Sequence, residues 1–251
     1  TYENTIYESD GVEAYCRYQI EHEEDILRPG PGFPLIKALL NLNNLPEQEG
    51  RVEVIIMSRN SPDSSLRVFK AIEHYGLNIT RAVLASGASL APYLSAFKTD
   101  LFLSAYEDDV QSAIDSNIAA GIICTDGLHT YDCDHQIRQI RVAFDGDAVL
   151  FSDESEQIYQ EYGLEAFEEN ERRNANNPLK AGPFAKFLRT LSELQKDFTT
   201  EEAPIRTALV TTRCAPAHER VIRTLRAWDV RIDEVFFLGG IRKKDVLQAF
   251  G

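Results

Sequence analysis

Short apolar runs alternate along the chain with longer amphipathic stretches. The runs have the composition of buried strands and occupy 52–58, 81–87, 100–105, 118–123, 141–147, 205–211 and 233–239. The stretches with helical spacing of apolar residues lie near 33–43, 63–75, 106–117, 183–195 and 216–228. Because alternation of strands and helices is typical of a parallel sheet flanked by helices, we predict an α/β fold.

The pattern of the first half returns in the second. Residues 6–43 match 158–195 at a shift of 152 residues, and 52–87 match 205–240 at a shift of 153. The matching pairs include Gly11/Gly163, Pro31/Pro183, Arg67/Arg220, Ile79/Ile232 and Gly87/Gly240. We therefore expect two duplicated lobes. The polar, turn-rich segment 124–136 is the expected junction, which gives lobes at 1–136 and 137–251.

The repeat also predicts what surrounds the chain. The strand at 141–144 has its expected counterpart before residue 1, and the counterpart of FKTDLFLSAYEDDV (97–110) would follow Gly251. We therefore expect the chain to be trimmed at both ends.

Composition narrows the classes of function. The net charge is −14, from 40 acidic and 26 basic residues, so nucleic acid would be repelled. No apolar run reaches 18 residues and the N-terminus lacks the features of a secretory signal, so we expect a cytoplasmic protein without a membrane segment. Four scattered cysteines, Cys16, Cys124, Cys133 and Cys214, favour reduced thiols over a disulfide framework.

Two aspartates follow the apolar run RVAF directly. Parallel sheets place their active sites at the carboxyl ends of strands, where Asp145 and Asp147 would lie on one side and Gly146 would let a ligand approach the backbone. Paired carboxylates repel unless a cation lies beside them, which predicts a hard divalent ion, preferably Mg²⁺, bound by Asp145 and Asp147. One carboxylate could attack phosphorus while the other moves a proton. The structural alternative is an acidic turn.

A second candidate site segment ends the run IRTALVT. Thr211 is followed by Thr212 and Arg213 before a predicted helix. Hydroxyl and backbone N–H groups at such a strand-to-helix turn suit a phosphate group. A threonine that only caps the helix is the alternative.

A third candidate follows the run DEVFFLG. The ammonium group of Lys243 could neutralise a phosphate and the attacking aspartate, although Arg242 and Lys244 are neighbouring candidates and a solvated surface lysine is the alternative. The three segments share one feature: Asp-x-Asp, then Thr, then Lys follow in this order along the chain, and each comes at the end of a predicted strand.

This ordered set resembles the motifs of the haloacid dehalogenase superfamily. The phrase AFDGDAVLFSDESE (143–156) is similar to the cytosolic 5′-nucleotidase I family in particular, and VEVIIMSRN, FKTDLFLSA, AGPFAKFLRTL, PIRTALVTTR and FFLGG also resemble segments of that family. The resemblance covers nearly the whole chain. It implies a haloacid-dehalogenase-like fold and Mg²⁺-dependent hydrolysis of nucleoside 5′-monophosphates, AMP above all.

The resemblance also implies a role for each motif residue. Asp145 would be the nucleophile that forms an aspartyl-phosphate, and Asp147 the acid/base that protonates the departing 5′-oxygen and later activates water. Thr211 would hold a phosphoryl oxygen, and Lys243 would neutralise developing charge. By analogy with the family, a homo-oligomer is expected.

The superfamily inserts a cap between its first and second motifs, which here corresponds to a helical insertion at about 152–200. Phe151, Ser152 and Glu154 at its start are therefore expected to contact the substrate.

The first lobe would be degenerate, with a structural role or a role in substrate selection. Arg59 and Asn60 in SRNSPDS could contact a nucleotide there, and a helix-capping loop is the alternative.

The superfamily's last motif, an acidic pair that completes the metal site, is missing before residue 251. Either it follows residue 251, or metal binding is impaired, or Glu107, Asp108 and Asp109 of the first lobe replace it.

The alternatives to a nucleotidase are another phosphatase of the superfamily and a non-catalytic nucleotide-binding or sensing protein. A zinc site at Cys124, His129, Cys133 and His135 is a further alternative, but the spacing matches none of the usual ligand patterns.

Overall fold

The computed structural model describes residues 2–124 and 137–251, and the chain forms two compact units. One contains residues 1–99, 103–112 and 122–137, and the other contains 100–102, 113–121 and 138–251. The expected junction at 124–136 lies almost entirely outside the described residues, as do His129, Cys133 and His135 of the zinc alternative. Cys16, Cys124 and Cys214 are free thiols.

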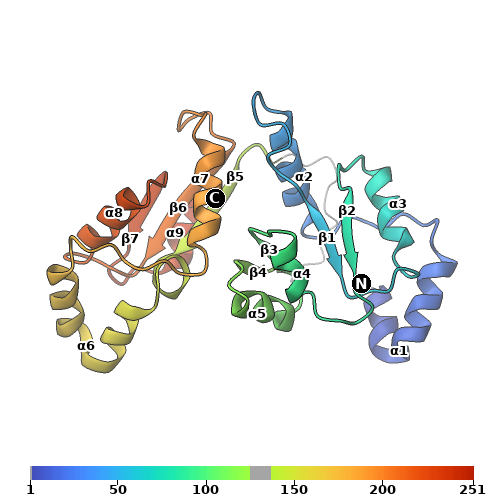
Figure 1. Cartoon of the computed structure of the whole chain (residues 1–251), viewed down its shortest axis with the longest axis horizontal. Helices are drawn as coiled ribbons and strands as arrows, with labels where there is room; N and C mark the ends of the chain where they lie inside the picture. The colour runs from blue at the N-terminus through green and yellow to red at the C-terminus, as the bar shows by residue number, and fades with distance from the viewer. Residues whose placement is uncertain (1, 125–136) are drawn as a thin grey trace. The chain divides into compact units, whose positions relative to one another are not determined.

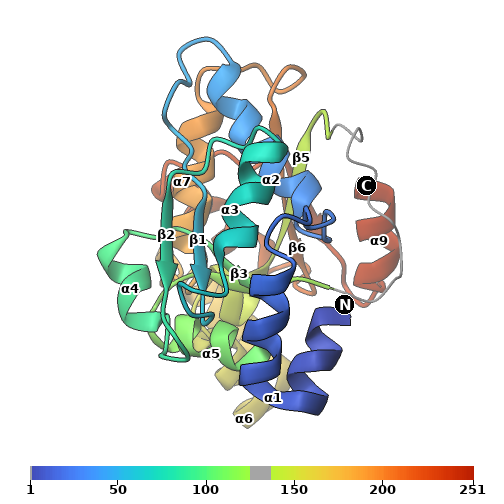
Figure 2. The same ribbon diagram turned by 90° about the vertical axis from the view of Figure 1, so that its right-hand side faces the viewer.

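The first half of the chain contains a small parallel sheet. Its elements are α1 (Tyr2–Glu21), α2 (Phe33–Asn41), a 3₁₀ turn (Leu42–Asn44), β1 (Ile55–Ser58), α3 (Leu66–His74), β2 (Arg81–Leu84), α4 (Ala91–Ala96), β3 (Phe102–Ser104), α5 (Glu107–Asp115) and β4 (Ala120–Ile122). Strands β1 and β2 are parallel neighbours beside α3 (Figure 2). Strands β3 and β4 form a separate pair.

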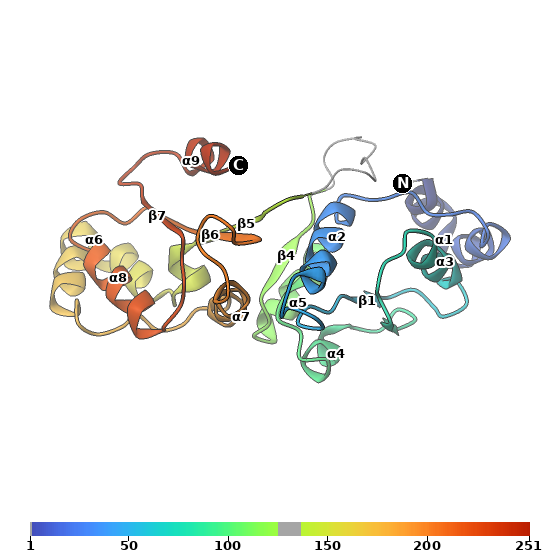
Figure 3. The same cartoon turned by 90° about the horizontal axis from the view of Figure 1, so that it is seen from above.

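The second half contains a three-stranded parallel sheet in the order β5-β6-β7 (Figure 1). Its elements are β5 (Ile140–Asp145), a turn (Gly146–Leu150), α6 (Glu154–Arg173), α7 (Ala185–Gln195), β6 (Ile205–Thr211), α8 (His218–Ala227), β7 (Glu234–Phe237) and α9 (Lys243–Phe250). Helices α7 and α9 cover opposite sides of this sheet (Figure 3). The fold is therefore a mixed α/β arrangement of parallel sheets flanked by helices.

The centre of the core is strand β6, which pairs on both edges. Five consecutive residues, 207–211, are buried, because helices cover both faces of a central strand and an apolar run can then be hidden on either side. The polar side chain of Thr207 is tolerated there because its hydroxyl and backbone N–H groups bond the carboxylate of Asp233. Strand β6 thus holds its final residue, Thr211, in a fixed place.

The last helix is attached to the first strand of this sheet. Arg141, near the start of β5, donates a hydrogen bond to the backbone carbonyl of Phe250, the final residue of α9. Its guanidinium carbon also lies 5.7 Å from the centroid of the Phe250 ring. The position of α9 over the sheet is therefore fixed at its carboxyl end.

Elements of the two halves agree in detail. Helices α1 and α6 both have 20 residues, and each is kinked at a glycine in nearly the same conformation, with φ 83° at Gly11 and φ 82° at Gly163. The strand registers agree as well: Ser58 pairs with Leu84 in β1–β2, and Thr211 pairs with Phe237 in β6–β7. Each residue of the second pairing lies 153 positions after its counterpart in the first.

Every predicted strand and helix is present, and several strands are shorter than predicted. The run 141–147 ends as a strand at Asp145, because Asp147 and Ala148 turn the backbone and Ala148 has φ 61°. Alternation along a strand therefore does not decide where the Asp147 side chain lies. Within the residues that the structure describes, no helix is both long and apolar enough to cross a membrane.

Candidate active site

The predicted motif residues gather at the carboxyl edge of the β5-β6-β7 sheet. Asp145 ends β5 and pairs in register with Val210, and Thr211 ends β6 one residue later. Lys243 begins α9, six residues after β7 ends at Phe237. Parallel strands bring their carboxyl ends to one edge, so three segments far apart in sequence meet there.

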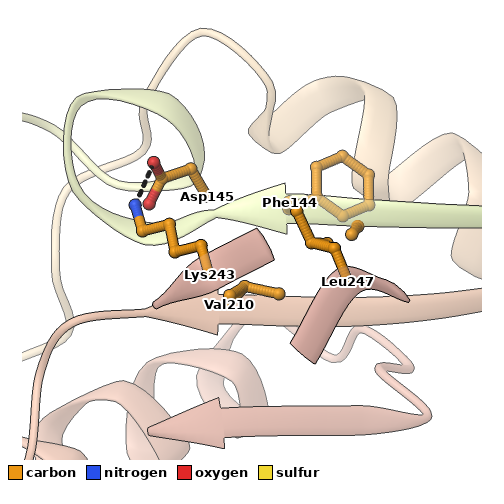
Figure 4. Close-up of a pocket in the computed structure, with 6 residues that line it drawn as sticks. Phe144, Asp145, Val210, Lys243 and Leu247 are labelled. Atoms are coloured by element: carbon orange, nitrogen blue, oxygen red, sulfur yellow. Dashed lines mark hydrogen bonds and ion pairs between the residues drawn. The ribbon is translucent and has the colours of Figure 1, made fainter. Parts of the chain in front are cut away.

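Asp145 and Lys243 form an ion pair at this edge. The carboxylate atom Oδ2 of Asp145 accepts a hydrogen bond of 2.6 Å from Nζ of Lys243 (Figure 4). The other oxygen, Oδ1, accepts one of 2.7 Å from the backbone N–H of Gly146. The two side chains are 43% and 38% exposed, so the pair is open to a ligand. Of the basic run 242–244, Lys243 makes this contact.

A small pocket adjoins the ion pair. Its volume is about 160 Å³, and it is lined by Ala143, Phe144, Asp145, Val210, Lys243 and Leu247 (Figure 4). Complete ligand pockets usually measure roughly 300–1,000 Å³. This pocket is therefore large enough for only part of a ligand. Of its lining side chains, those of Asp145 and Lys243 are charged and the other four are apolar.

Asp147 is held by a different cation. The Nε of Arg213 lies 3.2 Å from Oδ1 and 3.0 Å from Oδ2 of Asp147, and Nη2 lies 2.5 Å from Oδ1. On its other edge, Arg213 donates a 2.6 Å hydrogen bond to Glu171. Burial works against the charged guanidinium, but hydrogen bonds and charge from Asp147 and Glu171 outweigh it and raise the pKa of Arg213 above its usual value.

The two aspartates thus have separate partners within the chain. Their mutual repulsion was the reason to expect a divalent ion, but Lys243 and Arg213 each supply a positive charge to one of them. Among the described residues, no group of three or more His, Cys, Asp or Glu side chains could hold a metal ion. One or two carboxylates suffice for Mg²⁺ when substrate phosphate and water complete its shell, and the exposed Asp145 fits that requirement.

Thr211 packs directly against Gly146. A Cβ atom placed on Gly146 would lie 3.0 Å from both Cβ and Oγ1 of Thr211, closer than such atoms normally approach. The Oγ1 atom also accepts a hydrogen bond of 3.2 Å from the backbone N–H of Arg213. Because Gly146 has no side chain, the ends of β5 and β6 can meet here. This packing role is separate from the predicted one, in which Gly146 lets a ligand approach the backbone.

The other predicted substrate contacts of this half differ in exposure. Thr212 is exposed, whereas the side chain of Arg213 is 1% exposed and turned towards carboxylates. Phe151 is fully buried, with its ring centroid 5.6 Å from that of Trp228. Ser152 donates its backbone N–H to Lys180, and Glu154 forms an exposed ion pair with the side chain of Lys180. Thr212 is the member of this set with an open side chain next to Thr211.

Arg59 and Asn60 make local contacts after β1. Arg59 pairs with the buried Asp109 of α5, and the Nδ2 of Asn60 donates a 3.0 Å hydrogen bond to the hydroxyl of Tyr15. One of the three acidic residues proposed as a replacement metal site, Asp109, is therefore already neutralised. Burial raises the pKa of the Tyr15 phenol, although its hydrogen bond to Asn60 opposes that change.

Glu171 is the site residue that sequence reasoning missed. Its carboxylate is fully buried and bonds both Arg213 and Arg220. In the sequence it stands among several other acidic residues of α6, most of them exposed, so composition does not distinguish it. In the repeat it lies opposite the uncharged Gln19, so the repeat gives no signal for it either.

The sequence matches known proteins over nearly its whole length. A family model described as 5′-nucleotidase matches residues 1–251. Human cytosolic 5′-nucleotidase 1B is 40% identical over 252 residues, which cover 96% of this chain and 41% of the human protein. The chain thus spans well under half of that relative's length. No solved structure matches the chain significantly. With a match over its whole length, the chain belongs to the 5′-nucleotidase family.

Proposed function

We propose that this chain carries the catalytic site of a 5′-nucleotidase that hydrolyses nucleoside 5′-monophosphates, preferentially AMP, to nucleoside and phosphate. The observation that carries the proposal is the open ion pair between Asp145 and Lys243 at the carboxyl edge of the sheet, beside Thr211. Family membership supports the reaction class. The preference for AMP rests on the resemblance of the sequence motifs to the cytosolic 5′-nucleotidase I family.

Asp145 is the proposed nucleophile. Its Oδ attacks the phosphorus atom, the bond from phosphorus to the 5′-oxygen breaks, and an aspartyl-phosphate forms. Lys243 already contacts Asp145 and is close enough to share its charge with the phosphoryl oxygens as they take up the negative charge. The Thr211 hydroxyl and the backbone N–H groups after β6 bind a phosphoryl oxygen.

Asp147 is the proposed acid/base. It gives a proton to the departing 5′-oxygen, so that the nucleoside leaves as a neutral alcohol. In the second step it takes a proton from water, whose oxygen attacks phosphorus and releases Asp145 and phosphate. Both steps need the Asp147 carboxyl group to point towards the bond that breaks, and its contact with Arg213 is what holds the side chain in this structure.

Mg²⁺ is the proposed cofactor. It would neutralise phosphate charge, and Asp145 is the carboxylate best placed to hold it, since the oxygens of Asp147 are engaged by Arg213. Among the residues that the structure describes, no group of three or more His, Cys, Asp or Glu side chains could hold the ion by itself. Where Mg²⁺ binds, substrate phosphate and water would complete its shell.

We also propose that the fold is haloacid-dehalogenase-like and that its halves arose by duplication, with a first lobe at 1–136 and a catalytic lobe at 137–251. The matching kinks at Gly11 and Gly163 and the identical strand registers support this. Helix α6 falls within the proposed cap insertion of 152–200, whereas α7, although inside the same range, covers one side of the sheet (Figure 3). By analogy with the cytosolic relative we propose a cytosolic location, and a homo-oligomer remains a proposal.

The test is phosphate release from a panel of nucleoside 5′-monophosphates by the purified full-length protein, with and without Mg²⁺, beside an Asp145→Asn variant. We expect Mg²⁺-dependent release that favours AMP and is abolished in the variant. Equal activity of the variant would remove Asp145 from the mechanism. No release from any monophosphate would reject the nucleotidase and favour a nucleotide-binding role.

A further inference from the structure

A buried carboxylate lies behind the proposed acid/base residue. The side chain of Glu171 in α6 is 0% exposed, and its Oε2 accepts a 2.6 Å hydrogen bond from Nη1 of Arg213. Its Oε1 accepts bonds of 2.9 Å from both Arg220 and the hydroxyl of Ser155. Arg213 in turn bonds Asp147 through Nε and Nη2. The chain of contacts therefore runs from α6 through Glu171 and Arg213 to Asp147.

Stability alone is a weak explanation for this arrangement. Removing charges from water costs several kcal/mol for each ion, and well-packed apolar residues often stabilise a core as well as a buried ion pair does. The guanidinium of Arg213 is fixed at both edges, so it can hold a neighbouring carboxylate in one orientation. Of the two acidic partners of Arg213, Asp147 reaches solvent, with a side chain that is 16% exposed, and Glu171 does not.

The first half of the chain provides an internal comparison. Arg67, the counterpart of Arg220, donates from Nε to the backbone carbonyl of Asp25, and Arg220 donates from Nε to that of Asn177, 152 positions after Asp25. This structural contact is common to both halves. The two arginines differ in the carboxylate that they bind. Arg67 binds Glu3 near the start of α1, and Arg220 binds Glu171 near the end of α6.

The charged pair of Arg213 and Glu171 has uncharged counterparts in the first half. The repeat aligns Asn60 with Arg213 and Gln19 with Glu171. Asn60 bonds Tyr15, and Phe167, the counterpart of Tyr15, lies under the Arg213 guanidinium with 5.3 Å between that group's carbon and the ring centroid. The packing is thus conserved between the halves while the charged pair is confined to the half that contains Asp145 and Asp147.

We propose that Arg213 and Glu171 are positioning residues for Asp147: Arg213 fixes the orientation of the Asp147 carboxyl group, and Glu171 fixes Arg213. This inference rests on the proposed function, in which Asp147 protonates the departing 5′-oxygen. It also gives α6, within the proposed cap insertion, a direct mechanical connection to the reaction. In this inference both buried residues act through Asp147 and neither contacts the substrate.

The test compares two leaving groups on one nucleoside. AMP releases an alcohol that must be protonated, whereas an AMP analogue with sulfur in place of the bridging 5′-oxygen releases a thiolate that needs no proton. We measure the first-turnover release of nucleoside from each by wild type, Glu171→Gln, Arg213→Lys and, as a reference, Asp147→Asn. Loss of a positioned general acid is expected to slow AMP cleavage by about 10²-fold and cleavage of the thio analogue by less than about tenfold, with KM nearly unchanged.

The matched control is Arg220→Lys, which alters the other arginine on Glu171 without touching Asp147. It is expected to lower the melting temperature but to leave the ratio of the two rates unchanged. Equal slowing of both substrates in Glu171→Gln and Arg213→Lys, while the variants keep a cooperative unfolding transition, would overturn the positioning role. A wild-type protein that cleaves neither substrate would instead reject the proposed function, and this inference with it.

Discussion

Nζ of Lys243 lies 2.6 Å from Oδ2 of Asp145, although the residues are 98 positions apart. Asp145 is held by the end of β5 and Lys243 by the start of α9, so the contact depends on the correct assembly of the sheet with its last helix. Both side chains are more than a third exposed, and exposed ion pairs contribute little to stability. The pair is therefore better explained by chemistry than by folding.

Lys243→Gln should consequently separate activity from stability. Removal of the cation from the proposed transition state is expected to lower kcat for AMP by about 10²–10³-fold, with almost no change in melting temperature. Lys244→Gln, at an exposed neighbouring position, is the control and should retain full activity. Steady-state kinetics and thermal unfolding of the three proteins would measure this. Equal losses in both variants would mean that net charge, not the contact with Asp145, matters.

Gly146→Ala should damage the end of the sheet. The new Cβ would meet Thr211 at 3.0 Å, so either β5 or β6 must shift, at a cost of about 1–3 kcal/mol in the free energy of unfolding. Gly30→Ala is the control, because a Cβ there has no atom within 4 Å. Denaturant unfolding of both variants measures the difference. An unchanged free energy in Gly146→Ala would show that the two strand ends are not rigidly packed.

The two helix kinks should respond alike to substitution. Gly11 and Gly163 combine a φ near +83° with an extended ψ, which is a conformation essentially restricted to glycine. Alanine at either position is expected to reduce the free energy of unfolding by about 1–3 kcal/mol, or to straighten the helix. Hydrogen exchange of α1 and α6, beside denaturant unfolding, would distinguish these results. A loss at one position with none at the other would weaken the proposed duplication.

Asp233 should make stability depend on acid pH. Burial acts to raise its pKa, but hydrogen bonds from the Thr207 backbone, Arg231 and Gln195 outweigh this and hold the pKa below its usual value. Since the folded pKa is depressed, the stabilisation is complete above the unfolded value of about 3.9 and is lost as the pH falls through the folded pKa.

Asp233→Asn is therefore expected to lower the free energy of unfolding at pH 7 by about 1–3 kcal/mol, and the difference from wild type should shrink below about pH 4. Unfolding measured from pH 7 to pH 3 tests this. The control is Asp63→Asn, at an exposed position. A difference that stays constant across this range would contradict the assigned role of the charge.

The strands of the β5-β6-β7 sheet could be predicted because each is a short apolar run. The run at 205–211, for example, coincides with β6. The kinked helices α1 and α6 were harder to foresee: both are largely polar, and α1 was not predicted as a helix. Asp145, Thr211 and Lys243 could be found because each follows a strand. The contacts of Arg213 with Asp147 and Glu171, 66 and 42 positions away, depend on tertiary packing, which local patterns do not encode.

Helix α9 is fastened to β5 at both ends, by Lys243 on Asp145 and by Arg141 on the Phe250 carbonyl. An inserted or deleted residue between these anchors would turn one end of the helix by about 100° relative to the other, so both contacts could not form together. Exposed positions between the anchors, such as Lys244 and Gln248, face no such constraint. Natural variation in this helix is therefore expected to preserve its length more strictly than its sequence.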